Sequence, residues 1–569
     1  MQAEQAHAYK QPEFKLPGGR VMNPWMVLLS LMFGFFMSLL DATVVNIAIS
    51  DIQRDLKTDL TTVSWVLSAY NLVFAVLLVT MGRFADQYGR KLVFMLGMIM
   101  FSLGSFLCAI APSIEYLIAF RAIQGIGAAA LNPISLALIT VVFPPAKRGG
   151  AFAVWGAAAG MAAAIGPILG GFLVTISWRW IFFVNLPFCI IGLVMVWFFV
   201  PETRDQNASR KIDFLGLITI SSTMFCLVLA IIEGNSWGWT SGGILGLFAT
   251  SIISLALFIF IENRVAQPIV DFKLFKYRSF VAANITMFMF GIGIQGAFLI
   301  LVLFFIQAQG YTQLGAAYAL IPLPVASFIF SALAGRFNAK LNPRYMGIAG
   351  TVIVAIGLLS LVTLGVNDGW LDTAWRGIII GAGMGLCFTT FPSMALSEIP
   401  FNRVGVASGV FNTFRQIGFA LGVAILISVF TGQITDKVVT ARTNAINAVQ
   451  ASQPLPAQVK SNIVTGLQNS ASQAQGSGEG TSSSSTSYDL TKLVPLANIP
   501  NGEALRPELV RLNGVIAGEF KAAAVNSFDF TWLIAGLVAV VGIVPALFTR
   551  APQRRKEGEA APAFVAEMG

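Results

Sequence analysis

The sequence predicts an all-α membrane protein with fourteen transmembrane helices, and three observations support this class. Apolar residues make up 56% of the chain and charged residues 11%, whereas a globular domain carries about 25% charged residues. The mean hydropathy is +0.75. Apolar stretches of about 20 residues recur, which is the length that crosses a hydrocarbon core as a helix. Membrane β-strands would be shorter and would alternate in polarity, so helices are favoured.

The predicted spans follow a polar tail of residues 1–24, and the first apolar run is too long to be a removed signal peptide. Their approximate limits are 25–49, 60–81, 92–111, 114–142, 149–175, 179–200, 214–233, 243–262, 279–306, 314–335, 345–366, 374–397, 404–431 and 529–548. They divide into an N-terminal six-helix half (25–200), an inserted two-helix segment (201–278), a C-terminal six-helix half (279–550) and a second tail (551–569).

An internal repeat supports this division. The stretch Gly82 to Phe84 recurs as Gly335 to Phe337, and Ala119 to Arg121 is matched by Ala374 to Arg376 at nearly the same spacing. Two parallel halves with a binding site near the bilayer midplane are the plan of a transporter.

Charge predicts the orientation. Lys and Arg concentrate in the loops on the side of the N-terminal tail, whereas the short loops opposite hold Arg54, Lys57 and Arg179. Because cytoplasmic loops are enriched in these residues, both termini are placed in the cytoplasm of a plasma (inner) membrane protein. The same rule explains the net charge of +9 without nucleic acid, which we do not expect as a partner.

A long extracytoplasmic loop, 433–526, precedes the last predicted span. Its tract from Gly476 to Ser487 has almost no apolar residue and is predicted to be disordered. The flanking pieces, 434–467 and 507–525, have spaced apolar residues typical of surface helices, which would continue the thirteenth and fourteenth spans. A tolerated insertion at a loop tip is favoured over a binding device, and no partner for the loop can be named.

Two ionisable side chains lie deep inside predicted spans. Asp41 and Arg121 each stand about 12 Å from the outer end of their span at 1.5 Å per residue, so they can pair across the central cleft. Burial opposes a charge on Asp41 and a nearby guanidinium favours it, so a change of conformation could load and release a proton there. The alternative is a permanently ionised pair that holds helices together.

Other polar residues in the spans are candidates for a cavity. The repeat places Gln295 where the first half has Asp41, so one carboxylate would serve the cycle, and Arg415 lies about 16 Å inside the thirteenth span. The proposed cavity set is Asn46, Gln124, Gln295, Asn412, Arg415 and Gln416. The four cysteines, which lack CxxC spacing, suggest neither a metal site nor a disulfide.

Two glycine-containing motifs complete the candidate sites. Residues 82–91 read GRFADQYGRK and form a short charged turn between two spans, whose candidate residues are Gly82, Arg83, Asp86, Gly89, Arg90 and Lys91. The fifth span carries small residues at helical spacing that permit close packing or a flexible seal toward the outside. These residues are Gly156, Gly160, Gly166, Pro167, Gly170 and Gly171.

These motifs resemble those of the major facilitator superfamily. The 82–91 turn looks like its loop signature, Arg121 with Gln124 resembles its fourth-helix motif, and the glycine series looks like its antiporter motif. With LDATVVN at 40–46 and fourteen spans, the chain resembles the fourteen-helix drug:proton antiporters of the quaternary ammonium and multidrug efflux type. The resemblance implies that Asp41 is the proton or cation site and Arg121 its partner. It also implies that the 82–91 turn is a cytoplasmic gate in which Asp86 and Arg90 form a charge latch. Ala339 replaces Asp86 in the second half, so a latch there should be weak or absent.

The resulting expectation is a transporter rather than an enzyme. No GxxxxGK[ST] phosphate loop occurs, so the proton gradient takes the place of a cofactor. We expect export of lipophilic, cationic drugs in exchange for protons by alternating access. The alternatives are a dedicated proton-coupled exporter of one metabolite, antibiotic, lipid or siderophore, and a non-transporting membrane sensor or assembly partner.

Overall fold

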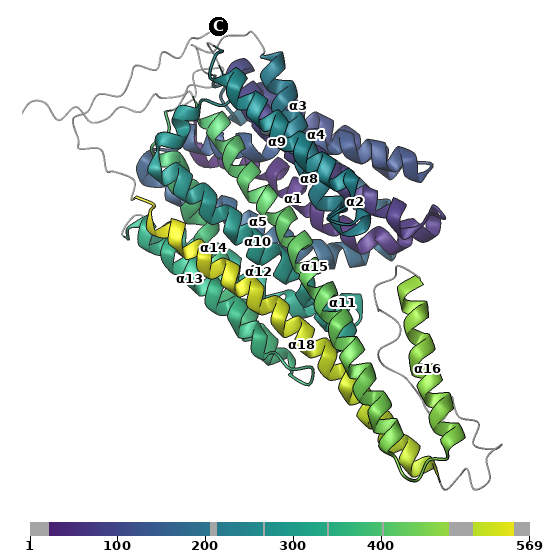
Figure 1. Cartoon of the computed structure of the whole chain (residues 1–569). Helices are drawn as coiled ribbons and strands as arrows, with labels where there is room; N and C mark the ends of the chain where they lie inside the picture. Colours follow the sequence, from purple (N-terminus) through teal and green to yellow (C-terminus); the bar gives the residue numbers. More distant parts are fainter. Residues whose placement is uncertain are drawn as a thin grey trace, which may run out of the picture.

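The structure is a computed structural model that describes residues 22–204, 213–265, 268–337, 341–400, 403–476 and 505–550. These residues form a helical bundle without strands (Figure 1). The predicted tails up to residue 21 and from 551, most of the 476–487 tract, and Ala339 lie outside the described residues. The all-α membrane class is confirmed.

The N-terminal half begins at a defined cap, because the Asn23 side chain accepts from the Trp25 N–H and Pro24 opens the first helix. Its helices are α1 (Pro24–Asp55), α2 (Leu60–Tyr88), α3 (Arg90–Ala109), α4 (Ile114–Val142), α5 (Pro145–Val174), α6 (Trp180–Phe183) and α7 (Asn185–Phe199). The inserted pair consists of α8 (Phe214–Trp237) and α9 (Gly242–Glu262), which pack on each other and, through α8, on α2.

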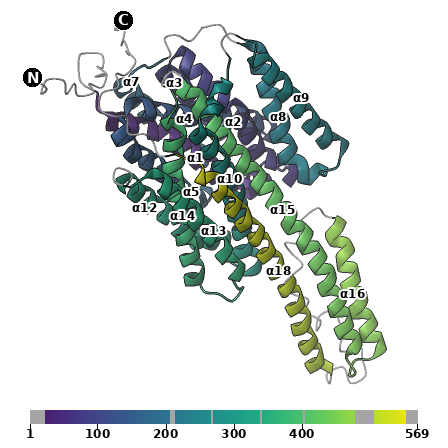
Figure 2. The same ribbon diagram turned by 60° about the vertical axis from the view of Figure 1, so that its left-hand side comes forward.

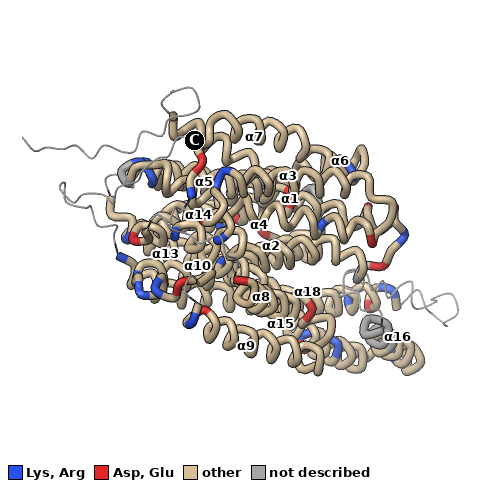
Figure 3. The backbone as a smooth tube through the Cα atoms, turned by 90° about the horizontal axis from the view of Figure 1, so that it is seen from above, with Lys and Arg blue, Asp and Glu red and all other residues tan. Residues whose placement is uncertain are grey.

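The C-terminal half follows a short turn, η1 (Phe272–Lys276). Its helices are α10 (Arg278–Leu303), η2 (Phe304–Ala308), α11 (Gln313–Leu320), α12 (Pro322–Phe337), α13 (Pro343–Ser360), η3 (Leu361–Thr363), α14 (Trp370–Ser397), α15 (Val404–Ala451), α16 (Ala457–Gly476) and α18 (Arg506–Leu547). Figure 3 shows the charged residues gathered toward the ends of the bundle, with few along its middle.

Thirteen helices in the described ranges are long and apolar enough to cross a membrane. The 30-residue α5 is not one of them, but it packs against α1 in its own half and against α12 and α14 in the other. The multi-pass character is therefore confirmed, while the count of fourteen spans and the side of the termini stay predictions.

The halves meet closely at the end of the bundle that carries the turn between α2 and α3. A Cβ added to Gly82 of α2 would collide with the carbonyl of Gly405 in α15. A Cβ on Gly335 of α12 would likewise collide with Ala153 of α5. Small residues thus bring two helix pairs from opposite halves into backbone contact, and this end of the bundle is shut. The distribution of Lys and Arg in the sequence predicts that this end faces the cytoplasm.

Three helices project far beyond the bundle at the opposite end (Figures 1 and 2). The 48 residues of α15 span about 72 Å at 1.5 Å per residue, more than twice the ~30 Å of a hydrocarbon core. The far part of α15 packs with α16 and the first part of α18, and we call these residues (433–476 and 505–525) the outer projection. It has an apolar core of its own, formed by Ala445, Val449, Leu455, Val459, Ile463, Leu467, Leu509, Leu512 and Ile516.

Candidate functional site

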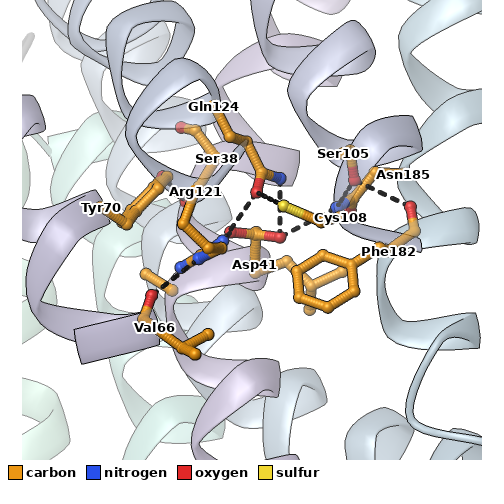
Figure 4. Close-up of polar contacts among 12 residues, drawn as sticks. Ser38, Asp41, Val66, Tyr70, Ser105, Cys108, Arg121, Gln124, Phe182 and Asn185 are labelled. Carbon is orange, nitrogen blue, oxygen red and sulfur yellow. Dashed lines mark hydrogen bonds and ion pairs between the residues drawn. The ribbon is translucent and has the colours of Figure 1, made fainter. Parts of the chain in front are cut away.

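A buried carboxylate, Asp41, lies at the centre of the N-terminal half (Figure 4). One of its oxygens accepts from Nη1 of Arg121 at 2.5 Å. The other accepts from Nε2 of Gln124 at 2.9 Å and from Nδ2 of Asn185 at 3.0 Å. Helices α1, α4 and α7 therefore supply one connected polar cluster, which we call the Asp41 network.

Packing fixes the guanidinium of Arg121. Its Nε donates to the Val66 carbonyl at 2.9 Å, and its plane lies 4.2 Å from the ring centre of Tyr70. Its Nη2 is buried and has no hydrogen-bond partner among the described residues. The close approach of α3 to α4 also restricts movement here. A Cβ on Gly104 of α3 would come within 2.6 Å of the backbone nitrogen of Gln124 in α4. Glycines thus let α3 press against α4 behind these side chains.

The hydrogen-bond pattern suits an ionised Asp41. Three donors face its two oxygens, and a carboxylate accepts without donating. Loss of any one of these donors would leave a buried polar group without a partner. Arg121 is the partner whose release matters most, because it would leave a buried cation without an anion. Asp41 and Arg121 therefore hold α1 and α4 together as a buried ion pair.

The structure places the two predicted residues together, but within one half. Asp41 and Arg121 lie on α1 and α4, so the expectation of a pair across the cleft between the halves is wrong. Sequence analysis also missed Asn185, Tyr70 and Ser105. Ser105 accepts from Asn185 Nδ2 at 2.9 Å and donates to the Phe182 carbonyl. A single amide inside an apolar run was the available signal for Asn185.

The C-terminal half has no matching network in its described part. Arg376, the repeat partner of Arg121, donates to the carbonyls of Ser360, Asp372 and Thr363 near the ends of α13 and α14. Its nearest carboxylate oxygen, on Asp368, is 4.0 Å away. Arg376 thus joins helix ends, and a central carboxylate comes from the N-terminal half.

The predicted gate is built around Asp86, which is fully buried at the end of α2. Its Oδ1 accepts from Nε and Nη2 of Arg90 at 3.1 and 2.7 Å and from the Gly405 N–H at 3.1 Å. Its Oδ2 accepts from the Val406 N–H at 3.0 Å. Gly405 and Val406 open α15, so a carboxylate of one half holds the positive N-terminus of a helix of the other.

The rest of the turn is held by Glu202, which follows α7. Its carboxylate accepts from the N–H groups of Lys91, Leu92 and Thr203, and so satisfies the first turn of α3. Burial raises the pKa of Glu202, and these backbone hydrogen bonds partly offset that shift. Gly89 joins α2 and α3 at φ +119°, and a Cβ there would meet the Glu202 carboxylate at 2.6 Å. A glycine is required at this position.

The glycines of α5 face two different neighbours. Gly156 and Gly160 lie against Ser331 and Ser327 of α12, at the contact between the halves. Gly166 and Gly170 lie against α1, close to Thr43 and Ile47, within the N-terminal half. Gly171 is half-buried, and the structure does not describe the side chain of Pro167. The series therefore serves helix packing on both sides of α5, and a seal toward the outside stays a prediction.

The predicted cavity residues separate into three groups. Gln124 belongs to the Asp41 network. Asn46 and Gln295 are exposed, and Gln416 is partly exposed. Asn412 and Arg415 are buried on α15, where Arg415 Nη2 donates to Asn412 Oδ1 at 2.7 Å. Among the described residues no group of His, Cys, Asp and Glu is placed to hold a metal ion.

These features define a multi-pass α-helical membrane transporter in which two halves meet along a central interface closed at one end. A sequence profile of the Major Facilitator Superfamily matches residues 31–423. The chain belongs to this family, as its motifs predicted. The match ends inside α15, so the outer projection lies beyond it.

Characterised relatives carry the names of drug-resistance proteins. The chain is 34% identical over 412 residues to multidrug resistance protein Stp of Mycobacterium tuberculosis, covering 72% of this chain and 76% of that protein. It is 34% identical over 421 residues to multidrug resistance protein 3 of Bacillus subtilis, covering 72% and 80%. The crystal structure of the human organic anion transporter MFSD10 has the same fold, with a TM-score of 0.55 and 14% identity over 72% of this chain and 94% of that one.

Proposed function

We propose that this protein exports lipophilic compounds across the plasma (inner) membrane in exchange for protons, with Asp41 as the proton site. The observation that carries the proposal is the Asp41 network, where a buried carboxylate is held by Arg121 and two amides. Intramembrane ionisable residues are costly, at roughly 2.5–3.5 kcal/mol on insertion scales, and are functional as a rule. The names of the relatives, multidrug resistance proteins, support export of drugs as the physiological task.

Coupling follows from competition for Asp41. A proton entering from the outside neutralises Asp41 and weakens its hold on Arg121, while return of Arg121 expels the proton to the other side. The α2–α15 contact at Asp86 closes the cytoplasmic end in one of the two access states. One proton crossing about 100 mV supplies about 2.3 kcal/mol, enough for roughly a 50-fold concentration ratio of a neutral substrate.

The expected preference for cations would use the same carboxylate. A cationic drug could replace Arg121 beside Asp41, so drug and proton would compete directly. A dedicated exporter of a single compound keeps the same coupling but a narrower site. A sensor or assembly partner would use the outer projection and would move no substrate.

The test uses the purified full chain in liposomes with an imposed pH difference. The wild type should concentrate several chemically unrelated dyes and move protons when substrate is added, whereas Asp41→Asn should give no uphill transport. Asp436→Asn, an exposed carboxylate in the outer projection, is the matched control and should behave as wild type. Uphill transport by Asp41→Asn would contradict the assignment of Asp41 as the proton site. Transport of one compound from the panel would favour the dedicated exporter, and absence of any flux would favour the sensor.

A further inference from the structure

Arg415 is a buried cation that the proposed proton cycle does not use. The residue is 5% exposed, and its Nε has no hydrogen-bond partner among the described residues. Its one side-chain hydrogen bond recorded there is to Asn412, one turn earlier on α15. No carboxylate of the described ranges lies within ion-pair distance of it, whereas the guanidinium groups of Arg90 and Arg121 each face a buried aspartate.

Aromatic rings from both halves cover this guanidinium. The Trp155 ring of α5 lies 5.4 Å from its central carbon, and the Phe419 ring of α15 lies 6.0 Å away. Arg415 and Trp155 lie about 16 and 15 Å from the starts of α15 and α5 at 1.5 Å per residue. This depth is the middle of a ~30 Å core, where substrate sites of transporters lie between the two repeats.

Trp155 also connects this place to the N-terminal half. Its Nε1 donates to Ser135 Oγ at 3.1 Å, and its ring stacks on Phe35 at 4.5 Å. Ser135 in turn donates to the Asn132 carbonyl, and Asn132 Nδ2 donates to Ser38 Oγ at 3.0 Å.

Ser38 is one turn of α1 from Asp41. Its carbonyl accepts from the hydroxyl of Tyr70, whose ring lies under Arg121. A continuous set of packed side chains therefore joins Arg415 to the Asp41 network.

We propose that Arg415 binds an acidic group of the transported compound, such as a carboxylate or an enolate, while Trp155 and Phe419 cover its aromatic body. This inference rests on the proposed function and narrows its substrate class. When the halves part, Arg415 leaves Trp155, and a guanidinium presents a planar pair of donors that fits a carboxylate. A fixed positive charge at this depth favours, among the lipophilic compounds transported, those that also carry an acidic group, zwitterions included.

The test compares two dyes that differ at one group. Rhodamine B carries a free carboxylate, and its ethyl ester has the same ring system without that charge. Equilibrium binding of both to the purified full chain is measured by fluorescence polarisation. The wild type should bind the free acid about 10- to 100-fold more tightly than the ester, the range of a hydrogen-bonded charge pair. Arg415→Gln should bring this ratio close to one, and Arg415→Lys should retain part of it.

Arg264→Gln, the same substitution at an exposed arginine, is the control and should keep the wild-type ratio. Ester binding as tight as acid binding by the wild type, binding of neither dye, or an unchanged ratio in Arg415→Gln would each overturn the proposal. An equal loss of affinity for both dyes in Arg415→Gln would also overturn the proposal, because Arg415 would then only hold the two halves together. The ratio of acid to ester affinity is measured without a pH gradient. If uphill transport fails while this ratio is as expected, proton coupling is overturned and the assignment of Arg415 as a substrate-binding residue is retained.

Discussion

Replacing Asp86 by asparagine tests whether the turn between α2 and α3 acts as a gate latch. The native carboxylate accepts two hydrogen bonds from Arg90 and one each from the N–H groups of Gly405 and Val406. Asparagine keeps one acceptor oxygen and loses the charge. At least one N–H at the start of α15 is then left without its acceptor, and Arg90 is left without its anion.

The size of the effect follows from these contacts. Hydrogen bonds to charged groups are worth about 1.5–3 kcal/mol, and an anion at a helix N-terminus adds about 0.3–1 kcal/mol. The part that joins the two halves is therefore about 2–3 kcal/mol, which corresponds to roughly a 30- to 150-fold shift toward opening at this end. Turnover should fall because the state closed at this end, through which each cycle must pass, becomes less favourable. Substrate affinity should change little, since no hydrogen bond of Asp86 reaches Asp41 or Arg415.

Distances between spin labels measure this shift directly. Tyr88 at the end of α2 and Tyr345 at the start of α13 are exposed and belong to different halves. Labels there should show a single distance in the wild type and in the control Asp436→Asn, and an additional population at larger distance in Asp86→Asn. A large loss of equilibrium substrate affinity with normal cycling in Asp86→Asn would refute the latch.

Three further predictions concern other parts of the chain. Asn185→Leu removes one of the three donors to Asp41 and leaves Ser105 Oγ without its Asn185 partner, so uphill dye export under an imposed pH difference should fall, whereas Asp436→Asn should keep the wild-type rate. Gly127→Ala should lower the midpoint of thermal unfolding by several degrees, because the new Cβ collides with α3, whereas Gly246→Ala, with open space around it, should not. Leu512→Ala removes a fully buried side chain from the outer projection at a cost of about 2–5 kcal/mol, so protease should cut the projection faster while dye export is unchanged if the projection is a spacer.

Sequence patterns were sufficient for the fold class and for the main polar residues. Hydropathy located the spans, and the cost of burying charge singled out Asp41 and Arg121 before their pairing was seen. Their similar depth allowed the pairing to be predicted, whereas its location depends on how α1 faces α4, which a single sequence does not specify. Hence the pair was expected across the cleft and lies within one half.

The partners of these residues were harder to predict. A buried amide such as Asn185 needs a hydrogen-bond partner, but the sequence does not indicate which residue that partner is. The partners of the gate residues were equally hard to predict. The 82–91 motif indicates a charged turn, but Asp86 accepts hydrogen bonds from the start of α15, more than 300 positions away in the sequence. The continuation of the thirteenth and fourteenth spans as helices into the loop was predicted from spaced apolar residues and is confirmed by α15 and α18, whereas their packing with α16 into one projection was not predicted.

Proton release on substrate binding tests the central claim most directly. The purified full chain is mixed with a transported dye in weakly buffered solution, and a pH indicator records the protons set free. Because proton and substrate oppose each other's binding, the wild type should release up to about one proton per bound dye, and Asp41→Asn should bind the dye and release none. Equal release by both proteins would contradict the account, because the coupled proton would then be bound elsewhere than at Asp41.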